Sequence, residues 1–315
     1  MELVNCNLCG SSDYRKVYAK PDHLFFKDEW FTVVECCNCG LGFVNPRPTF
    51  EEIARYYPKD YYEYDPNQLR FKIEGEYLRE MFPDATGRLL LDVGCANGEF
   101  PGYMRTLGWQ SEGVEVSGNS KTMAELKVYR EEFPRIDVNE ARYDAVTAWA
   151  VLEHVHDPMA YFKKTYEVLK PGGIFVFMMP NFGSISSRNL FLEDVPRHLY
   201  FFKESTVRKY LSHVGLTLLK ADYDDNVFKM SPVNWLHYYV HRFLKRREFE
   251  WKDIPKTKTE YLEERQLPST LSSNLKYIIA NPLVAFDRAL MPLFEQYQKV
   301  AKKYGSVTYV ASKHS

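Results

Sequence analysis

The stretch Leu89–Phe100, LLLDVGCANGEF, decides the fold of this 315-residue chain. Its three leucines form a short apolar run typical of a buried strand, which ends in Asp92. Gly94 and Gly98 follow, and we expect a helix to begin near Glu99. Glycines let the backbone approach a ligand closely, and the first amides of a helix have no partner within the helix. The stretch therefore predicts a strand, a ligand-binding turn and a helix in an open α/β sheet.

A second acidic position indicates which kind of ligand the turn binds. Residues 111–117, SEGVEVS, predict the next strand. Glu115 lies about twenty residues beyond the turn, where an acid accepts hydrogen bonds from ribose hydroxyls. The turn lacks the G-x-G-x-x-G spacing that seats a pyrophosphate, and Asp92 directly before it would repel phosphate and attract a cation. This pattern favours a nucleoside that carries an amine and a sulfonium.

Four motifs then occur in order along the chain. They are LDVGCANG (91–98), GVEVS (113–117), YDAVTAWAVLEHVHDP (143–158) and LKPGGIFVFMMPN (169–181). They resemble the successive motifs of class I S-adenosylmethionine-dependent methyltransferases, over roughly residues 86–223. The resemblance implies an enzyme with a Rossmann-like α/β fold, a seven-stranded methyltransferase sheet and S-adenosylmethionine as cofactor.

The resemblance also implies which residues bind the cofactor. These are Asp92, Gly94, Cys95, Ala96, Gly98, Glu115, Val116, Glu131 and Trp149. Asp92 and the backbone of the turn would hold the methionine part, Glu115 the ribose, and Trp149, at the end of the fourth strand, would contact the cofactor. Ala96 stands where many members of the family have a glycine. Cys95 is interpreted as a small buried side chain rather than a nucleophile.

Adenine recognition is harder to assign. We expect the third strand at residues 126–130, LKVYR, so that Glu131 or Glu132 would reach the exocyclic amine, with Asp137 as a substitute. The alternative is that each of these carboxylates is simply solvated.

Methyl transfer to a protonated nucleophile needs a base, and two histidines are candidates. His154 follows the fourth predicted strand and His198 follows the fifth, so both belong to the carboxyl end of the sheet, where such sheets bind ligands. An imidazole titrates near neutrality, as a base for a hydroxyl or a carbon beside a ketone should. Resemblance to sugar C-methyltransferases favours His198. Alternatively, either histidine only holds its loop, His154 together with Glu153.

Five of the six cysteines lie in the first forty residues, in CNLCG and CCNCG. Two C-x-x-C pairs, each followed by a glycine that permits a tight turn, predict a tetrahedral Zn²⁺ site made by Cys6, Cys9, Cys36 and Cys39. Cys37 is surplus. Four thiolates leave no open position on the ion, so we expect a structural site. A pair of disulfides is the alternative, disfavoured for a protein expected to be cytoplasmic.

This zinc-binding module, followed by a tyrosine-rich segment, resembles the front end of deoxysugar C-methyltransferases. The resemblance implies a small-molecule acceptor, a nucleotide-linked sugar or glycan precursor. VLEHVHDP (151–158) also resembles quinone-type O-methyltransferases, so a quinone-type or lipid-linked acceptor is the alternative. A third possibility is a non-enzymatic zinc-containing adaptor with a vestigial cofactor fold.

The expected domain organisation follows from these motifs. It comprises a zinc-binding module (1–45), a helical connector or lid (46–85), the methyltransferase domain (86–223), an insertion for acceptor binding or oligomerisation (224–304) and a final antiparallel strand with a tail (305–315). In the connector, Thr49 and Glu52 form a capping box that predicts a helix ending at Pro58. Tyr56, Tyr57, Tyr61, Tyr62 and Tyr64 would pack between modules or, less favoured, cover a ligand.

The insertion contains two apolar segments. Residues 277–294, YIIANPLVAFDRALMPLF, are interrupted by polar residues, so we expect a core helix rather than a membrane span. Residues 233–251 are aromatic, include the basic cluster Lys245, Arg246 and Arg247, and precede a polar stretch expected to be a loop. This segment would pack on the sheet or on a second subunit, which makes a homo-oligomer possible; contact with a membrane surface is the less favoured alternative.

Composition limits the class of partner. The chain has 41 basic and 42 acidic residues, a net charge of −1, which disfavours nucleic acid. It lacks a leader-like opening and a run of eighteen apolar residues, so the expectation is a soluble, cytoplasmic protein.

Overall fold

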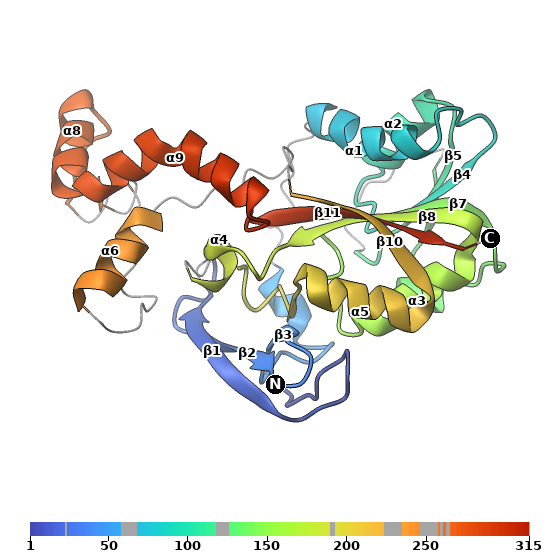
Figure 1. Cartoon of the computed structure of the whole chain (residues 1–315), viewed down its shortest axis with the longest axis horizontal. Helices are drawn as coiled ribbons and strands as arrows, with labels where there is room; N and C mark the ends of the chain where they lie inside the picture. Colours follow the sequence, from blue (N-terminus) through green and yellow to red (C-terminus); the bar gives the residue numbers. More distant parts are fainter. Residues whose placement is uncertain are drawn as a thin grey trace.

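A large sheet between two helical layers forms the centre of the molecule (Figure 1). The computed structural model describes residues 1–22, 24–57, 68–117, 126–189, 193–223, 235–245, 258, 261–262 and 265–314. Tyr61, Tyr62, Tyr64, Arg246 and Arg247, and most of the predicted polar loop, lie outside these ranges.

The large sheet has seven strands in the order β10-β11-β8-β7-β4-β5-β6. The strands are β4 (Leu89–Val93), β5 (Gln110–Val114), β6 (Lys127–Tyr129), β7 (Tyr143–Trp149), β8 (Leu169–Pro180), β10 (Leu216–Asp222) and β11 (Ser306–Lys313). β11 runs antiparallel to both neighbours, and the pairs from β8 to β6 are parallel. The predicted fold class, a Rossmann-like α/β methyltransferase sheet, is confirmed.

Helices cover both faces of this sheet. α1 (Gln68–Met81) and α2 (Glu99–Thr106) lie on one face, and α3 (Pro158–Val168) and α5 (Glu204–Val214) on the other (Figure 1). Each face has its own buried cluster, one including Leu90 and the other Leu91, because successive strand residues point to opposite sides. Both faces being covered explains why the central strands β4 and β8 contain continuous apolar runs.

A second, four-stranded sheet is formed mainly by the N-terminal region. It comprises β1 (Tyr14–Pro21), β2 (Trp30–Cys36), β3 (Gly42–Val44) and β9 (Tyr200–Phe201). β9 comes from the segment after β8, and Gly42 pairs with Phe201. A side chain at Gly42 would come within 2.6 Å of the Phe182 ring. The N-terminal sheet is thus completed by residues distant in the sequence.

The connector contains less helix before residue 58 than predicted. The capping box is present, since Thr49 and Glu52 exchange amide-to-side-chain hydrogen bonds of 3.0 and 3.3 Å. Only the single 3-10 turn η1 (Ile53–Tyr56) follows it, so the prediction of a helix reaching Pro58 is wrong. Tyr56 is buried and its ring packs edge-on against Phe31, which keeps this segment against the N-terminal sheet.

The insertion contains α6 (Trp235–Lys245), α8 (Leu271–Ala280) and α9 (Pro282–Val300), which extend away from the large sheet (Figure 1). The prediction of one core helix over residues 277–294 is wrong. Pro282 has no amide hydrogen and begins a new helix, which breaks the segment in two. In the described ranges, the structure contains no helix that is both long and apolar enough to cross a membrane.

Candidate active site

The turn after β4 is built from left-handed backbone conformations. The φ angles are +74° at Gly94, +47° at Ala96 and +86° at Gly98. A side chain at Gly94 would lie 2.6 Å from Val151 Cγ2, so this glycine lets the turn touch the segment that carries His154. Ala96 adopts the conformation that glycine favours, at a cost of roughly 1 kcal/mol. Ala96, which replaces the glycine of the family pattern, therefore lies at a position where the backbone adopts a left-handed conformation.

Cys95 is buried beneath the turn. Its Sγ lies 2.5 Å from the point where a side chain at Gly113 on β5 would begin. Burial, reinforced by the charges of Asp92 and Glu115, raises the pKa of its thiol well above the usual range. The geometry agrees with a small packed side chain, so Cys95 offers a ligand only its backbone.

Glu115 lies directly against the turn. Its carboxylate accepts hydrogen bonds from the amides of Ala96, at 3.0 Å, and Ser117, at 2.7 Å. The neighbouring Val116 is 61% exposed. Glu131 is also exposed, in the segment after β6, and its role toward adenine stays a prediction.

Asp92 and Trp149 lie side by side in the sheet, beneath α1 and α2. Asp92 is 2% exposed and accepts a hydrogen bond from Thr147 Oγ1 at 2.7 Å. Burial raises the pKa of its carboxyl to about 7, against the opposing effects of Thr147 and Arg70. The Trp149 ring packs edge-on against Phe100, with ring centroids 5.6 Å apart, and among the described residues its Nε1 has no hydrogen-bond partner.

These residues fit S-adenosylmethionine. Two carboxylates flank a turn that contains no basic residue, which suits a cationic ligand with ribose hydroxyls. The buried indole N–H of Trp149 is an unsatisfied donor of the kind that a ligand satisfies. The residues present are thus compatible with a charged nucleoside, and the roles of Asp92, Glu115 and Trp149 toward it stay predictions.

His198 is held by a buried carboxylate. Its Nδ1 lies 2.7 Å from Glu193 Oε2, and Glu193 also accepts a short hydrogen bond from Ser187 Oγ. An Nδ1–H that donates to Glu193 leaves Nε2 as the basic nitrogen. The Asp194 amide is farther from Nδ1, at 3.4 Å, than the Glu193 carboxylate is. The shorter contact with Glu193 therefore favours the tautomer with the proton on Nδ1. Burial lowers the pKa of His198, but Glu193 and the charges of Glu153 and Asp194 outweigh this and raise it.

His154 contacts His198 but has a different environment. The two rings are edge-on with centroids 4.7 Å apart, and His154 Nδ1 lies 2.9 Å from Tyr57 Oη and 3.1 Å from the Arg197 carbonyl oxygen. Burial, with the charge of His198, lowers the pKa of His154 to about 3. His154 is therefore neutral at physiological pH, and of the two histidines His198 is the better base.

Glu153 is a site residue whose side chain the sequence analysis passed over. Its backbone carbonyl accepts hydrogen bonds from the amides of Leu199 and Tyr200, which ties the segment after β7 to β9. The carboxylate is 1% exposed, and in the described part of the chain neither oxygen has a hydrogen-bond partner. Burial raises the pKa of Glu153 to about 7. The available signal was the apolar pair before it, Val151 and Leu152, which indicates a buried position.

Glu153, His154 and His198 also satisfy the spacing of a metal site. One ligand atom from each lies within 4.8 Å of the others. Two imidazoles and a carboxylate are a common ligand set for divalent ions. A metal bound by Nε2 of His198 would remove the lone pair that a base needs, so the two uses of this cluster exclude each other.

The segment carrying His198 is fixed by Arg197, which the sequence analysis also missed. Arg197 is fully buried, and all five of its N–H donors find acceptors. Two carboxylates, Asp22 and Asp194, each take a pair of these bonds, and the fifth goes to the Tyr56 carbonyl. Because Asp22 follows β1, the N-terminal sheet sets the position of the residue next to His198.

The four predicted metal-binding cysteines come together. Sγ–Sγ distances are 3.4 Å for Cys6–Cys39 and 3.6 Å for Cys9–Cys36, and all four sulfurs lie within 4.8 Å of one another. These distances are too long for disulfides and suit four ligands around one ion. The exposed Cys37 is not part of the cluster. Gly10 and Gly40 have φ of +73° and +82°, as the predicted tight turns require.

The turn between Cys6 and Gly10 is hydrogen-bonded to the helices on one face of the large sheet. The Asn7 side chain donates to Asp157 at the start of α3 and accepts from the Met159 amide and from Tyr210 Oη on α5, at 2.9 to 3.0 Å. The cysteine cluster is therefore coupled to the helices below the sheet.

A family comparison agrees with this geometry. A family model described as a methyltransferase domain matches residues 54–221, more than half of the chain. The chain belongs to this methyltransferase family. The fold is that of class I S-adenosylmethionine-dependent methyltransferases, and the predicted enzyme class is confirmed.

Individual relatives are more distant. The ubiquinone biosynthesis O-methyltransferase of Alkalilimnicola ehrlichii is 31% identical over 128 residues, which are 38% of this chain and 50% of the relative. That of Albidiferax ferrireducens is 29% identical over 117 residues, 34% of this chain and 46% of the relative. The chain thus spans about half the length of these curated relatives.

One solved structure similar to this methyltransferase is a putative sarcosine dimethylglycine methyltransferase from Galdieria sulphuraria. It is 18% identical, and the match covers 78% of this chain and 84% of that chain, with a TM-score of 0.47.

Proposed function

We propose that this methyltransferase transfers the methyl group of S-adenosylmethionine to a small-molecule acceptor that loses a proton to His198. The observation that carries the proposal is the 2.7 Å contact between His198 Nδ1 and the buried Glu193 carboxylate, which presents Nε2 as a base. This histidine belongs to the segment after β8, at the same carboxyl edge of the sheet as the glycine turn. Deprotonation by a positioned base contributes about 10²–10⁴-fold to such reactions.

The roles of the other residues follow from their surroundings. When bound, S-adenosylmethionine supplies a methyl carbon on a positive sulfur, which a nucleophile attacks in line as the carbon–sulfur bond breaks. Asp92 and the turn backbone would hold the methionine part, Glu115 the ribose and Trp149 Nε1 a polar atom of the cofactor. Glu193 fixes the His198 tautomer and stabilises the imidazolium after proton uptake. Arg197 holds the backbone next to that imidazole.

Two acceptor classes are supported by different observations. The resemblance of the N-terminal region to deoxysugar C-methyltransferases supports a nucleotide-linked sugar or glycan precursor. The names of the curated relatives support O-methylation of a quinone-type phenol. Both acceptors have an acidic O–H or C–H proton, so His198 would serve either. The sugar remains our first choice because the four-cysteine cluster belongs to that resemblance.

The four-cysteine cluster, in this proposal, binds one structural Zn²⁺. Four sulfurs around one point suit the ion's tetrahedral preference and leave no position for a substrate. The ion would keep the N-terminal sheet folded, and the Asp22–Arg197 pair would transmit that order to His198.

The experiment is methyl transfer from labelled S-adenosylmethionine to panels of nucleotide sugars and of dihydroxylated aromatic compounds. His198→Asn is expected to lower turnover at least about a hundredfold without weakening cofactor binding measured by calorimetry. His213→Asn, in the exposed last turn of α5, is the matched control and should leave turnover unchanged.

Each outcome decides between named alternatives. Equal turnover of His198→Asn and wild type would remove His198 as the base. Failure of the wild-type protein to bind S-adenosylmethionine would favour the adaptor hypothesis. The active panel identifies the acceptor class, and loss of activity on adding a chelator to protein with an intact cysteine cluster would favour a metal at Glu153, His154 and His198.

A further inference from the structure

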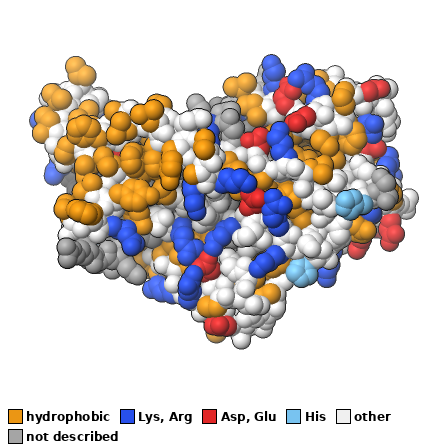
Figure 2. Space-filling view, viewed as in Figure 1, with side chains coloured by type: hydrophobic (Ala, Val, Ile, Leu, Met, Phe, Trp, Pro, Cys, Tyr) orange, Lys and Arg blue, Asp and Glu red, His pale blue; other side chains and the backbone are white. Residues whose placement is uncertain are grey.

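The helices of the insertion expose an apolar surface that the methyltransferase reaction does not explain. Orange side chains gather over α8 and α9 in Figure 2, on the part of the molecule that extends from the sheet. Six large ones are Leu275, Ile279, Phe286, Leu290, Leu293 and Tyr297. Ile279 is 69% exposed and Leu293 is 73% exposed. We call these six residues the α8–α9 surface.

This exposure is not a by-product of poor packing within the arm. An adjacent side of α9 is well packed, since Phe294 stacks on Trp235 of α6 at a centroid distance of 4.0 Å. The buried Asp287 carboxylate accepts a hydrogen bond of 2.7 Å from the Leu236 amide. α9 therefore has one apolar side against α6 and a second, along residues 286, 290, 293 and 297, that faces outward. Apolar patches of this kind mark contact sites.

The charge of this segment indicates the kind of partner. Residues 265–304 contain six basic and two acidic residues, a net charge of +4, in a chain whose total is −1. Of the two acids, Asp287 is fully buried and Glu295 pairs with Lys299 at 3.1 Å. Lys302 also pairs with an acid, Glu204 of α5, at 3.2 Å. Among the described residues of this segment, the charges that remain after these pairs are therefore basic. A second copy of the chain would bring the same positive charge and be repelled, whereas an anionic surface would be attracted.

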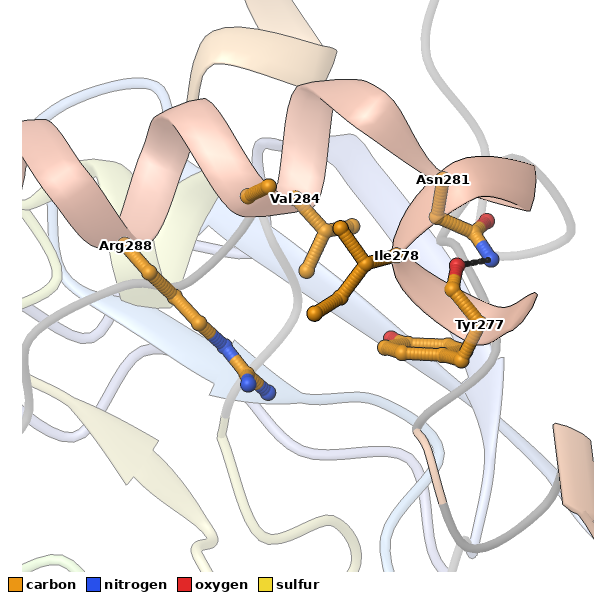
Figure 3. Close-up of a pocket in the computed structure, with 6 residues that line it drawn as sticks. Tyr277, Ile278, Asn281, Val284 and Arg288 are labelled. Carbon is orange, nitrogen blue, oxygen red and sulfur yellow. Dashed lines mark hydrogen bonds between the residues drawn. The ribbon is translucent and has the colours of Figure 1, made fainter. Parts of the chain in front are cut away.

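Apolar and basic groups converge where the two helices meet. A cavity of about 190 Å³ is lined by Tyr277, Ile278, Asn281, Val284, Ala285 and Arg288 (Figure 3). Its walls are largely apolar, and the Arg288 guanidinium lies at its side. Within the described ranges, Arg288 is exposed and the structure records no ion-pair partner for it. This cavity is on the arm, in elements that carry none of the residues assigned to the active site.

We propose that the α8–α9 surface docks on an anionic lipid bilayer. The apolar side chains would enter the boundary between headgroups and acyl chains, as in interfacial amphipathic helices. Arg288, Lys276 and the other basic residues of the segment would contact the anionic headgroups. The sequence-based preference for packing on the sheet or a second subunit concerned residues 233–251 and stays a prediction. The six side chains of the α8–α9 surface lie outside that segment and remain exposed after α6 and α9 have packed.

The experiment is co-sedimentation of the full chain with vesicles. One set is phosphatidylcholine alone, and the other contains roughly one-third phosphatidylglycerol. Partitioning onto the anionic vesicles is expected to be at least about tenfold stronger and to weaken at high salt. Leu293→Glu should lower it at least about tenfold. Leu219→Glu, at a residue 50% exposed on β10 and outside the arm, is the matched control and should change nothing.

Ile279→Glu on α8 repeats the test on the other helix in case Leu293→Glu does not fold, as checked by circular dichroism. Equal binding to both vesicle types, or equal loss in Leu219→Glu and Leu293→Glu, would overturn the proposal. A dimer in light scattering that Leu293→Glu dissociates would overturn it in favour of a second copy. The co-sedimentation experiment does not measure methyl transfer, so its result is independent of the proposed role of His198.

Discussion

The N-terminal region and the inserted helices both attach to the same sheet, but the first contains buried charged side chains and the second contains exposed apolar ones. The N-terminal region buries charge: Asp22 and Arg197 are both fully buried and paired. The insertion exposes apolar side chains, with Leu293 at 73%. Neither choice favours stability by itself, since buried ion pairs carry a desolvation cost and exposed leucines forgo burial.

The difference indicates what each region does. Buried, fully hydrogen-bonded charges hold one geometry because every alternative leaves a charge unpaired, and here they fix the backbone beside His198. Exposed apolar residues stabilise nothing until a partner covers them. We therefore expect the N-terminal region to support the chemistry of the site and the inserted helices, under the docking proposal, to position the protein on a membrane.

The largest expected effect comes from the cysteine cluster. Cys6→Ser removes one of four sulfurs and should lower the metal content below one ion per chain. It should also cost on the order of 5 kcal/mol in folding free energy, because metal binding and folding of such a site are coupled. Metal analysis and thermal unfolding measure both effects. Cys37→Ser, which removes an exposed thiol outside the cluster, is the control. Metal-free wild-type protein with unchanged unfolding would show that thiols alone hold the region.

The next effect compares an ion pair from each region. Arg197→Met removes the guanidinium that pairs with the fully buried Asp22 and the partly buried Asp194, and should cost about 3–5 kcal/mol in urea unfolding. Lys299→Met on α9 removes the partner of Glu295 in a partly exposed pair at i,i+4 spacing, and should cost about 0.5 kcal/mol. Similar costs for both variants would mean that burial does not distinguish the two regions.

How far the sequence predicted these features depended on distance along the chain. The glycine turn, the strands beside it and the cysteine cluster were recognisable because apolar runs, glycines and C-x-x-C spacing are local signals, whereas the seven-stranded sheet was implied by the family resemblance. The contact of Arg197 with Asp22 joins residues 175 positions apart, and β9 completes a sheet that begins at residue 14. No local pattern marks such pairings.

The prediction for the insertion failed for another physical reason. An apolar segment predicts that a helix has an apolar side but not that anything covers it, so a core helix was expected where two exposed helices lie. The apolar pair before Glu153 indicates a buried position, but the lack of a hydrogen-bond partner for its carboxylate among the described residues depends on the elements that pack around it.

A smaller effect concerns pH. The native pKa of Glu153 is about 7, well above the ordinary glutamate value of about 4.3, so the native state holds a proton that the unfolded state has lost. Its contribution to stability is therefore complete below about pH 4 and is lost as the pH rises through 7. Glu153→Gln should be more stable than wild type at pH 8, by roughly 1–3 kcal/mol, and similar to it at pH 4.

Urea unfolding at the two pH values measures this difference. Glu295→Gln, on the partly exposed side of α9, is the control from the other region and should show no comparable change between pH 4 and pH 8. A stability gain for Glu153→Gln that is the same at both pH values would rule out ionisation as its cause.

The smallest expected effect is that of replacing an alanine with glycine, which should stabilise the protein in the cofactor turn and destabilise it in α9. Ala96 in the cofactor turn has a φ of +47°, where a Cβ is strained. Ala96→Gly should therefore stabilise the protein and raise its free energy of unfolding by about 0.5–1 kcal/mol. Ala289 lies exposed in the middle of α9, where glycine costs about 1 kcal/mol relative to alanine. Thermal unfolding should thus move up for the first variant and down for the second. If both variants lose stability, the left-handed turn is not strained in the folded protein, and the case that Ala96 replaces a required glycine fails.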